Sequence, residues 1–562
     1  MTFQKFIKLS FLSFVIFFFL GCVKLSRLIE TGQPSQKFNL IIRNGKIVDG
    51  TGNAWFYADV GIKNGKITRI GNLTGCKSRN EINAKGLIVS PGFIDVHTHI
   101  DSSLLKHPYA ENYIRDGVTT IVAGNCGGSV LDVAKHFKSL KKKGVAINVA
   151  TLIGHNTILS KVKGDVAGEL TPEQMEECEK LLKKAMYEGA VGMSTGLIYS
   201  PGKYSSIEEI VELQKVVAEL GGIYASHMRN ESTRILEAID ETLRIGKEAN
   251  SRIEISHFKL PGDNTIGGSK TILQKVLDAR AQGQEVWLDQ YPYTASSTGI
   301  SMLFPDWLFE KGSSEAKKIL SDPNGLKRVL VDMKQQHEVE RHRSDFSFAV
   351  ITSSRAYPEF IGKNLKEVTQ ILKLKKEKGE SVDWKNISPL ELPEVSMEEQ
   401  YLTIVDIYLK GGASCVYHTQ SEEDVVNIMQ CPLVAICSDG GLQEPGEGKP
   451  HPRSYGSNAR VLGRYVREKK VLTLEDAIRK MTSLPALAFR FKDRGGLREG
   501  YWADITIFNP DTIIDKATFE NPHQYSEGIE YVIVNGEIVF ANGKLTGKLP
   551  GKPVYGPAYD FN

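Results

Sequence analysis

Short apolar segments alternate with helix-like segments through most of the 562 residues of this chain. Eight of the apolar segments have the length and composition of β-strands: Phe93–Val96, Val118–Ala123, Val145–Leu152, Ala190–Ser194, Ile223–Ser226, Ile253–Ser256, Glu285–Asp289 and Leu433–Cys437. Strands separated by helices are typical of a parallel sheet, because each parallel pair needs a crossover between its strands. Eight such units predict an α/β fold with a TIM-like (β/α)8 barrel, and an open doubly wound sheet is the alternative.

Two helix starts support this alternation. Thr171 precedes Pro172, and proline is favoured at the first position of a helix, where its missing N–H costs no intrahelical bond. Ser206 and Glu209 have the spacing of a capping box, in which each side chain bonds to the backbone N–H of the other residue. We therefore expect a helix to begin after each of these positions.

An Asn-Gly pattern occurs near both ends of the chain, at Asn44-Gly45, Asn64-Gly65 and Asn535-Gly536, each time between apolar stretches. In this setting Asn-Gly predicts a type I′ hairpin, because both central residues must adopt positive φ. The simplest account is one small β domain of the sandwich type, assembled from residues 37–89 and 497–550. The barrel would then occupy residues 90–496, between the two halves of that domain.

The stretch between about residues 301 and 400 interrupts the barrel pattern. It is longer than a single crossover needs, and much of it is charged and helix-like. We interpret it as an inserted subdomain that covers the mouth of the barrel. A peripheral addition without a role at the site is the alternative.

Composition and charge exclude one class of partner. Hydrophobic residues make up 41% of the chain and charged residues 24%, which is typical of a globular protein with a large core. The length suggests two or three structural units. The formal net charge is only +3 and there is no long run of one sign, so the sequence does not support nucleic-acid binding through a basic face.

The first 21 residues differ from the rest of the chain. Lys5 and Lys8 precede a run from Leu9 to Leu20 that is apolar apart from two serines. Such a run is too short to cross a bilayer but suits the apolar core of a secretory signal. It ends at Gly21-Cys22, which resembles the bacterial lipobox, where the cysteine is lipidated. We expect residues 1–21 to be a lipoprotein-type signal peptide, with export to the bacterial cell envelope and a membrane anchor on Cys22. A buried first helix is the alternative.

Potential metal ligands follow several of the eight strands, at the end where barrel enzymes carry their chemistry. The first strand leads into His97-Thr98-His99, and two residues apart on an extended chain both imidazoles point to the same side. The second strand leads to Cys126 among glycines, and later strands lead to His227, His257 and Asp439. Any one of these histidines could be an ordinary core residue. Together, four His, one Cys and one Asp at strand ends predict a metal site.

These motifs resemble the amidohydrolase superfamily. That superfamily often carries a carboxylated lysine on its fourth strand, but the fourth strand here, Val191-Gly192-Met193-Ser194, contains no lysine. Cys126 offers the missing negative ligand, which is similar to the D-aminoacylase, or N-acyl-D-amino-acid deacylase, branch. Residues 194–199, 226–229, 451–453 and 461–468 are similar to that branch too, and the resemblance extends from about residue 38 to about residue 540.

The resemblance implies a zinc-dependent hydrolase of linear amides. A thiolate and two imidazoles suit Zn²⁺, and Cys126, His227 and His257 would hold one ion tightly. By the same resemblance His97, His99 and Asp439 line a second site that is weaker or empty, and the sequence leaves open whether one or two ions bind. Zinc lowers the pKa of water and polarises a carbonyl, and Asp439 would take a proton from the water and pass it to the leaving nitrogen.

Substrate contacts are expected around the same strand ends. In the family, residues at the positions of Tyr199, Lys259 and Ser296 are implicated in binding the substrate carboxylate, which needs a cation and hydroxyl donors. Lys259 lies two residues beyond His257, so on an extended chain its side chain would face the same cavity. A lysine stem lying along the surface and purely structural aromatics are the alternative. Further candidates are Tyr293, Arg229 and His451.

We therefore expect hydrolysis of N-acyl-D-amino acids to a carboxylate and a free D-amino acid. A cyclic amidase of the dihydroorotase or hydantoinase type is the nearest rival, and the missing strand-four lysine argues against it. A nucleobase deaminase would share the fold. A non-catalytic, lipid-anchored binding protein is the rival from another class, but such a protein would have no reason to keep Asp439 beside metal ligands.

Overall fold

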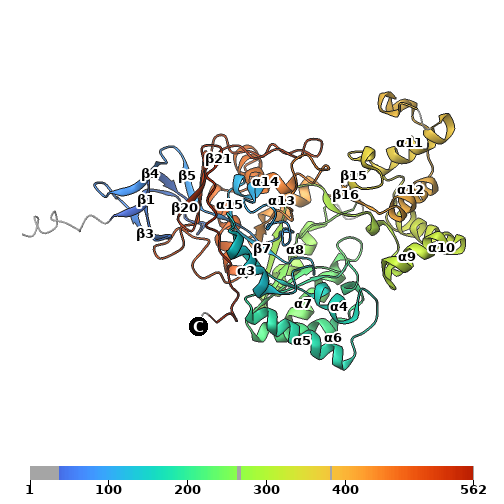
Figure 1. Ribbon diagram of the computed structural model, residues 1–562, viewed down its shortest axis with the longest axis horizontal. Coiled ribbons are helices and arrows are strands. Elements are labelled where there is room, and N and C mark those ends of the chain that lie inside the picture. Colours follow the sequence, from blue (N-terminus) through green and yellow to red (C-terminus); the bar gives the residue numbers. More distant parts are fainter. Residues whose placement is uncertain (1–36, 263–266, 380–381, 561–562) are drawn as a thin grey trace, which may run out of the picture.

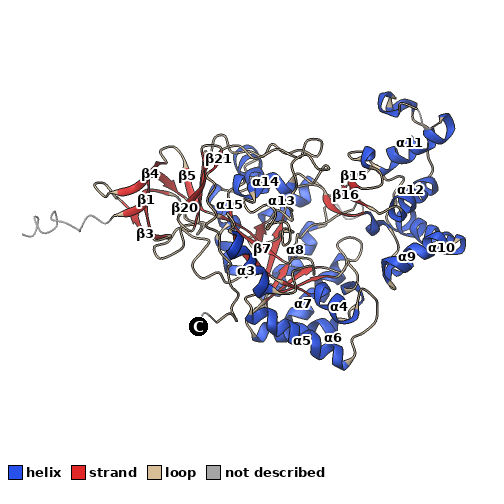
Figure 2. Ribbon diagram, in the orientation of Figure 1, coloured by secondary structure: helices blue, strands red, loops and turns tan. Residues whose placement is uncertain are grey.

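The computed structural model describes residues 37–262, 267–379 and 382–560, which form three parts (Figure 1). A small β domain lies at one end of the molecule, a barrel in the middle and a mostly helical inserted subdomain at the other end (Figure 2). The expected signal peptide and Cys22 lie outside the described residues. Within the described ranges, no helix combines the length and hydrophobicity that crossing a bilayer requires.

The small β domain is one nine-stranded sheet built from both ends of the chain. Strand β18 pairs antiparallel with β5, which joins the two halves. Leu40, Ile62 and Ile505, from both halves, are buried in one core. The strands are β1 (Phe38–Ile47), β2 (Phe56–Lys63), β3 (Lys66–Gly71), β4 (Ser78–Asn83), β5 (Ile88–Pro91), β18 (Ile505–Phe508), β19 (Ile529–Val534), β20 (Glu537–Ala541) and β21 (Lys544–Leu545).

Two of the three Asn-Gly pairs make the expected turns. Asn64-Gly65 connects β2 to β3 and Asn535-Gly536 connects β19 to β20, and all four residues have positive φ. The expectation for Asn44-Gly45 is wrong. Asn44 has a φ of 57°, but the pair lies inside β1, at a shift in its register with β2. There the left-handed residue makes a bulge in a continuous strand instead of a reversal.

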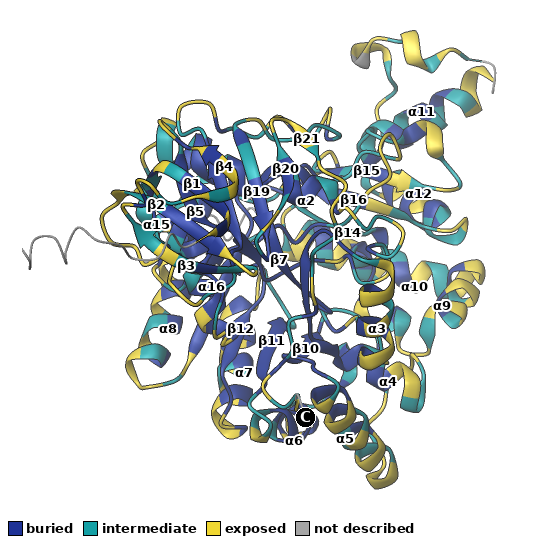
Figure 3. Ribbon diagram, turned by 60° about the vertical axis from the view of Figure 1, so that its left-hand side comes forward, coloured by how far each residue is buried: buried dark blue, intermediate teal, exposed yellow. Residues whose placement is uncertain are grey.

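The barrel contains eight parallel strand positions, which is the fold that the alternation predicts. They are β6 (Phe93–Asp95), β7 (Val118–Ala123), β8 (Asn148–Thr151) continued by β9 (Ile153–Gly154), β10 (Gly192–Gly196), β11 (Ile223–His227), β12 (Ile253–Ile255), β13 (Val286–Gln290) and β17 (Val434–Ile436). Backbone bonds from Asp439 to His97 and from His99 to Gly440 connect the last position to the first. Figure 3 shows β10, β11 and β12 buried side by side at the centre of the molecule.

Helices follow most of these strands and pack on the outside of the barrel (Figure 1). Thr171 and Ser206 form complete capping boxes at the starts of α5 and α6, as expected. The helices are α2 (Glu111–Arg115), α3 (Val133–Lys143), α4 (His155–Lys163), α5 (Pro172–Tyr187), α6 (Ile207–Glu219), α7 (Ile235–Glu248), α8 (Ser269–Ala281), α13 (Glu422–Gln430), α14 (Arg453–Arg460), α15 (Leu474–Met481) and α16 (Ser483–Ala488).

The inserted subdomain follows β13 and has a hydrophobic core of its own, which includes Phe346, Phe360 and Ile404. It contains the strands β14 (Ser296–Gly299), β15 (Ala349–Ser354) and β16 (Ala413–Tyr417) and the helices α9 (Gly312–Ser321), α10 (Pro323–Lys334), α11 (Leu365–Lys378) and α12 (Met397–Leu409). Its bounds are therefore wider than about 301–400. The reason is that β16 pairs with both β14 and β15, so the small sheet closes only near residue 417.

Candidate active site

Three of the expected site residues occupy an unusual backbone conformation directly after barrel strands. Cys126, His257 and Asp439 have φ values of 53°, 36° and 48°. Non-glycine residues rarely adopt positive φ, and such conformations concentrate at functional sites, where the surrounding structure holds them. Each of these left-handed residues lies two or three residues beyond the end of its strand, and its side chain faces the same cavity.

Cys126, His227 and His257 form the first of two donor clusters. The Cys126 Sγ lies 3.5 Å from His227 Nδ1 and 3.4 Å from His257 Nε2, and the two nitrogens are 2.8 Å apart. Burial lowers the pKa of both histidines well below its usual value, so both rings are neutral and each can offer a lone pair. Three donor atoms from three strand ends thus face one point.

The chemistry of this cluster and its two sulfur-to-nitrogen spacings fit zinc, whereas the 2.8 Å between the two nitrogens is shorter than the separation of about 3.3 Å that a tetrahedral ion would set. With Zn–S of about 2.3 Å and Zn–N of about 2.0–2.1 Å, a tetrahedral ion separates its sulfur and nitrogen ligands by about 3.5 Å. Both sulfur-to-nitrogen distances agree with that value. Burial raises the pKa of the Cys126 thiol, and a bound cation would favour the thiolate. One soft sulfur and two imidazoles are a ligand set that selects zinc over magnesium or calcium.

His97, His99 and Cys126 form the second cluster, so the cysteine belongs to both. His97 Nε2 lies 3.3 Å from the Cys126 Sγ, and His97 Nδ1 faces the buried carboxylate of Asp289 at 3.4 Å. His99 differs, because its side chain is 41% exposed and its Nε2 lies 2.9 Å from Asp439 Oδ1. This cluster is therefore exposed at His99, which bonds to the expected acid–base residue.

Asp439 lies between the second cluster and a buried arginine. Its Oδ1 contacts His99, and its Oδ2 lies 2.6 Å from Arg453 Nη1. Burial alone would raise the pKa of Asp439, but the Arg453 guanidinium holds it well below the usual value. The carboxylate is thus ionised in the resting protein and able to accept a proton.

A cavity of about 610 Å³ lies over these strand ends. Barrel residues line one side of it, including His99, Cys126, His227, His257 and Asp439. The inserted subdomain lines the other side with Met302, Trp307, Arg341, Phe348 and Tyr417. The inserted subdomain therefore forms a wall of the cavity, in agreement with the interpretation that it covers the barrel mouth.

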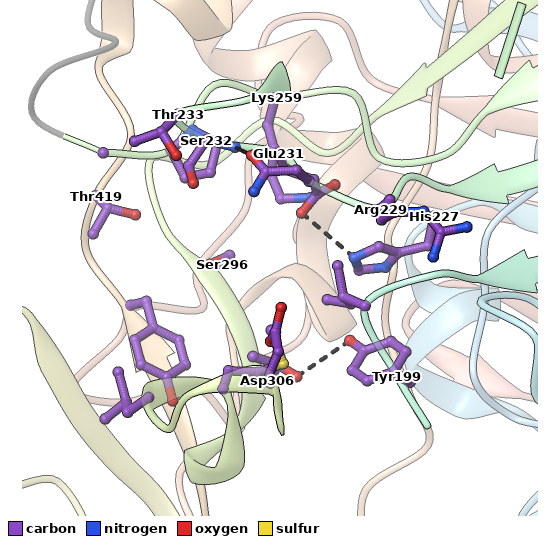
Figure 4. A pocket seen from close by; sticks show the side chains of 18 of the residues that line it. Tyr199, His227, Arg229, Glu231, Ser232, Thr233, Lys259, Ser296, Asp306 and Thr419 are labelled. Carbon is purple, nitrogen blue, oxygen red and sulfur yellow. Dashed lines mark hydrogen bonds and ion pairs between the residues drawn. The ribbon is translucent and has the colours of Figure 1, made fainter. Parts of the chain in front are cut away.

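Tyr199, Lys259 and Ser296 all line this cavity (Figure 4). The Tyr199 hydroxyl lies 3.2 Å from Thr298 Oγ1 on β14. The Lys259 ammonium is buried and donates to Glu231 Oε1 at 2.5 Å, and its Nζ lies 2.9 Å from His257 Nδ1. Lys259 thus faces the cavity beside a metal-ligand candidate, although the positive φ of His257 shows that the chain there is not extended.

Two of the expected substrate contacts are placed differently. Tyr293 does not line the cavity, because its ring packs against His451, Phe519 and Arg460 in the buried region behind it. Arg229 reaches the cavity wall, but its guanidinium forms an ion pair with Glu241 at 2.7 Å and donates to the backbone of residues 203 and 205. It therefore stabilises the wall and has little capacity left for a ligand.

Among the cavity residues that were not predicted from the sequence, three lie beside the predicted site residues. Tyr291 takes the place expected of Tyr293, with Lys259 and Arg453 near its ring. Arg453 belongs to the His451-Pro452-Arg453 motif, which pointed to this site through its histidine and not its arginine. Glu231 follows His227 by four residues in a loop, and no sequence spacing rule marks it. His451 itself bonds to the backbone of Ala295.

The similarity to known proteins extends over nearly the whole chain. A model of the amidohydrolase family matches residues 80–284 and 434–540. A D-aminoacylase from Alcaligenes xylosoxydans xylosoxydans is 33% identical over 541 residues, which cover 92% of this chain and 98% of that protein. An N-acyl-D-glutamate deacylase from the same organism is also 33% identical, and the match covers 90% of this chain and 94% of that protein.

A solved structure agrees with the sequence relatives. The N-acyl-D-glutamate deacylase from Bordetella bronchiseptica, complexed with zinc and a phosphonate inhibitor that mimics the tetrahedral intermediate, superposes with a TM-score of 0.76. It is 32% identical and covers 92% of this chain and all of its own. The likeness therefore includes the β domain, the barrel and the region of the inserted subdomain.

Proposed function

This chain belongs to the amidohydrolase family and, within it, to the D-aminoacylases and N-acyl-D-amino-acid deacylases, and on that premise we propose that it hydrolyses N-acyl-D-amino acids to a carboxylate and a free D-amino acid. The observation that carries the proposal is the convergence of Cys126, His227 and His257 beside an ionised Asp439 in one cavity. A cavity with these groups can hold an electrophilic ion and move a proton.

Zinc is the cofactor that this donor set supports. Cys126, His227 and His257 would hold the tighter ion, and His97, His99 and Cys126, with Asp439, would line a weaker second position. When bound, zinc polarises the amide carbonyl and makes water acidic enough to supply a nucleophile near neutral pH. One tightly bound ion would be enough for activity, and an ion at the second position would be dispensable.

Asp439 performs the proton transfers. It is held between His99 and Arg453, so its carboxylate has a fixed position and stays ionised until water gives up a proton. The protonated side chain then delivers that proton to the leaving nitrogen, which departs as an amine. One carboxylate thus serves as base and then as acid.

Lys259, Ser296 and Tyr199 position the substrate. The α-carboxylate of an N-acyl amino acid is two bonds from the scissile nitrogen, so a cation near the metal site can hold the carboxylate and orient the amide together. Lys259 is that cation, at 2.9 Å from His257 Nδ1. The hydroxyls of Ser296 and Tyr199 line the same cavity and supply further donors.

The cyclic-amidase rival is less consistent with the site. Strand β10 has the sequence Gly-Met-Ser-Thr-Gly and carries no lysine, and Cys126 supplies the shared negative ligand in its place. The non-catalytic rival leaves Asp439 unexplained, because an ionised carboxylate buried between His99 and Arg453 is costly to maintain without a use.

A panel of N-acyl-D- and N-acyl-L-amino acids tests the proposed function. Release of free amine should be confined to D-substrates and should require zinc. Equal rates on both enantiomers would contradict the assignment, and hydrolysis of dihydropyrimidines or hydantoins in preference to linear amides would favour the cyclic-amidase rival.

We also propose that the protein is exported and anchored to a membrane of the bacterial cell envelope through lipid on Cys22. The support is the charged start, the apolar run and the Gly21-Cys22 pair in the sequence. Cys22→Ala should release the protein from the membrane fraction or block its processing. A full-length chain that keeps residues 1–21 and stays in the cytoplasm would contradict both the signal and the anchor.

A further inference from the structure

We propose that Glu231 fixes the metal-binding tautomer of His257 and orients the ring of His227, against a competing hydrogen bond from Lys259. This inference rests on the zinc-dependent function proposed above and assigns a positioning role within it. Glu231 lies in the loop between β11 and α7, close to the ends of both histidine-bearing strands. Its side chain is 12% exposed and lies between Lys259 and His227 in the cavity wall (Figure 4).

The geometry places one carboxylate behind both imidazoles. The nitrogens that face Cys126 are His227 Nδ1 and His257 Nε2, so the distal nitrogens are His227 Nε2 and His257 Nδ1. Glu231 Oε1 lies 3.1 Å from His257 Nδ1, and its Oε2 lies 3.6 Å from His227 Nε2. Among the described residues, no other carboxylate lies within ion-pair distance of these two distal nitrogens.

The distal nitrogens need an acceptor when the ring binds a metal. A neutral imidazole that donates its lone pair through one nitrogen carries its proton on the other, and ligand histidines almost always donate that N–H to a partner. His227 Nε2 is buried without a hydrogen-bond partner within the described part of the chain, and the Glu231 carboxylate is the acceptor beside it. A small ring rotation would bring His227 Nε2 into hydrogen-bond range.

Lys259 competes with Glu231 for a hydrogen bond to His257 Nδ1. Its Nζ is 2.9 Å from His257 Nδ1, and an ammonium can only donate. If that bond dominated, His257 Nδ1 would be the acceptor and the proton would sit on Nε2, the nitrogen that faces Cys126. That tautomer cannot bind a metal. Glu231 Oε1 is within 2.5 Å of the same ammonium and can accept both from it and from His257 Nδ1, which resolves the conflict.

Glu231 therefore links two functions of the cavity. It holds the Lys259 side chain in place for the substrate carboxylate through their 2.5 Å contact, and it directs the Lys259 protons away from His257. Removing Glu231 should weaken zinc binding through the tautomer, and removing Lys259 as well should restore much of it. A carboxylate with a purely structural role would not produce that recovery.

Zinc dissociation constants, measured by competition with a chromophoric chelator, test the proposal on four proteins: wild type, Glu231→Gln, Lys259→Met and the double variant. We expect Glu231→Gln to bind zinc about 10–100-fold more weakly, the range found when partners of ligand histidines are removed. Lys259→Met should bind zinc like the wild type, and the double variant should recover at least half of the loss on a logarithmic scale. Wild-type affinity in Glu231→Gln, or no recovery in the double variant, would overturn the proposal.

Two further variants control for structure. Glu241→Gln removes a carboxylate from the same region, but its partner is Arg229 and not a ligand histidine, so zinc affinity should be unchanged. Glu231→Asp keeps the charge on a shorter stem and should lie between wild type and Glu231→Gln, which supplies the measurement if Glu231→Gln folds poorly. Affinity is measured without substrate, so these results stand apart from the deacylase panel. A protein inactive on D-substrates would refute the function and leave this test intact.

Discussion

The two donor clusters share Cys126 but differ in how their histidines are enclosed. His227 and His257 are both buried, and their distal nitrogens face one carboxylate. In the other cluster His97 is fully buried, whereas the His99 side chain is 41% exposed and bonds to Asp439. The first cluster is closed around its donors, and the second opens to the cavity through His99, which bonds to the proposed acid–base residue.

This difference assigns tight binding of the metal to the closed cluster and catalytic turnover to the open cluster. A buried cluster with neutral rings binds an ion with little rearrangement, because the donors are already dehydrated and aimed at one point. An exposed imidazole that bonds to a carboxylate must exchange that bond for a metal, which weakens the site. The comparison therefore predicts one tight ion at the closed cluster and a weaker, dispensable one at the open cluster.

The largest effect should come from the shared ligand. Cys126→Ala removes a donor from both clusters and the negative charge that neutralises the ion, so tight zinc and activity should both be lost. Elemental analysis of the purified variant measures the metal, and amine release measures activity. If Cys126→Ala keeps its full zinc content, Cys126 is not a ligand that the two clusters share.

Asp439→Asn should lower catalytic turnover without changing the zinc content. The variant keeps the shape of the side chain near His99 but cannot accept a proton, so kcat should fall by about 10²–10⁴-fold, as for loss of a general acid–base group. Tight zinc should stay close to the wild-type content, because the closed cluster does not use Asp439. Near-normal kcat would move the proton transfer to another group, with His97 or His99 next in line.

The pattern of strands predicted the barrel because the strands are short and apolar and most are followed by a helix, two of which have a recognisable start signal at Thr171 and Ser206. The pattern could not separate a hairpin from a bulge at Asn44-Gly45, since both need a left-handed residue and only pairing with β2 decides. It also ended the inserted subdomain too early. The partner of β16 is β14, more than a hundred residues earlier, and no local signal carries that pairing.

At the site, the sequence supplied the ligand candidates because strand ends and residue type are local properties. It chose Tyr293 where the structure places Tyr291 in the cavity, since the direction of each side chain after β13 depends on tertiary packing. It missed Glu231, which has no fixed spacing from the donors. It placed Lys259 correctly from extended geometry, although His257 has positive φ and the contact arises from the fold around it.

A smaller effect is expected for His99, the exposed member of the open cluster. His99→Asn removes the hydrogen bond at 2.9 Å that orients Asp439, so kcat should fall by about 10–100-fold while the tight zinc stays bound. The matched variant is His227→Asn in the closed cluster, which should lose tight zinc. If the two variants lose zinc equally, the closed and open clusters do not differ in affinity and the comparison fails.

The smallest effect should come from Lys259, which lies at the edge of the closed cluster without being a ligand. Lys259→Met keeps the apolar stem and removes the charge, so zinc content should stay normal. A partly desolvated, charge-assisted contact to a carboxylate is worth about 1.5–3 kcal/mol. Because Glu231 already shares the ammonium, we expect the low end of that range, a loss of about tenfold in kcat/KM.

A substrate whose α-carboxylate has been converted to an amide shows whether Lys259 reads that group. The wild type should lose activity on the amide, since the ammonium then faces a neutral group while it remains paired with Glu231. Lys259→Met should lose little on going from acid to amide, because the charge that distinguishes them is gone. If wild type and variant discriminate equally between the acid and the amide, Lys259 contacts only Glu231 and the histidines. Another group must then bind the carboxylate. Arg453 is then the next candidate, since it lines the same cavity and its guanidinium is buried beside Asp439.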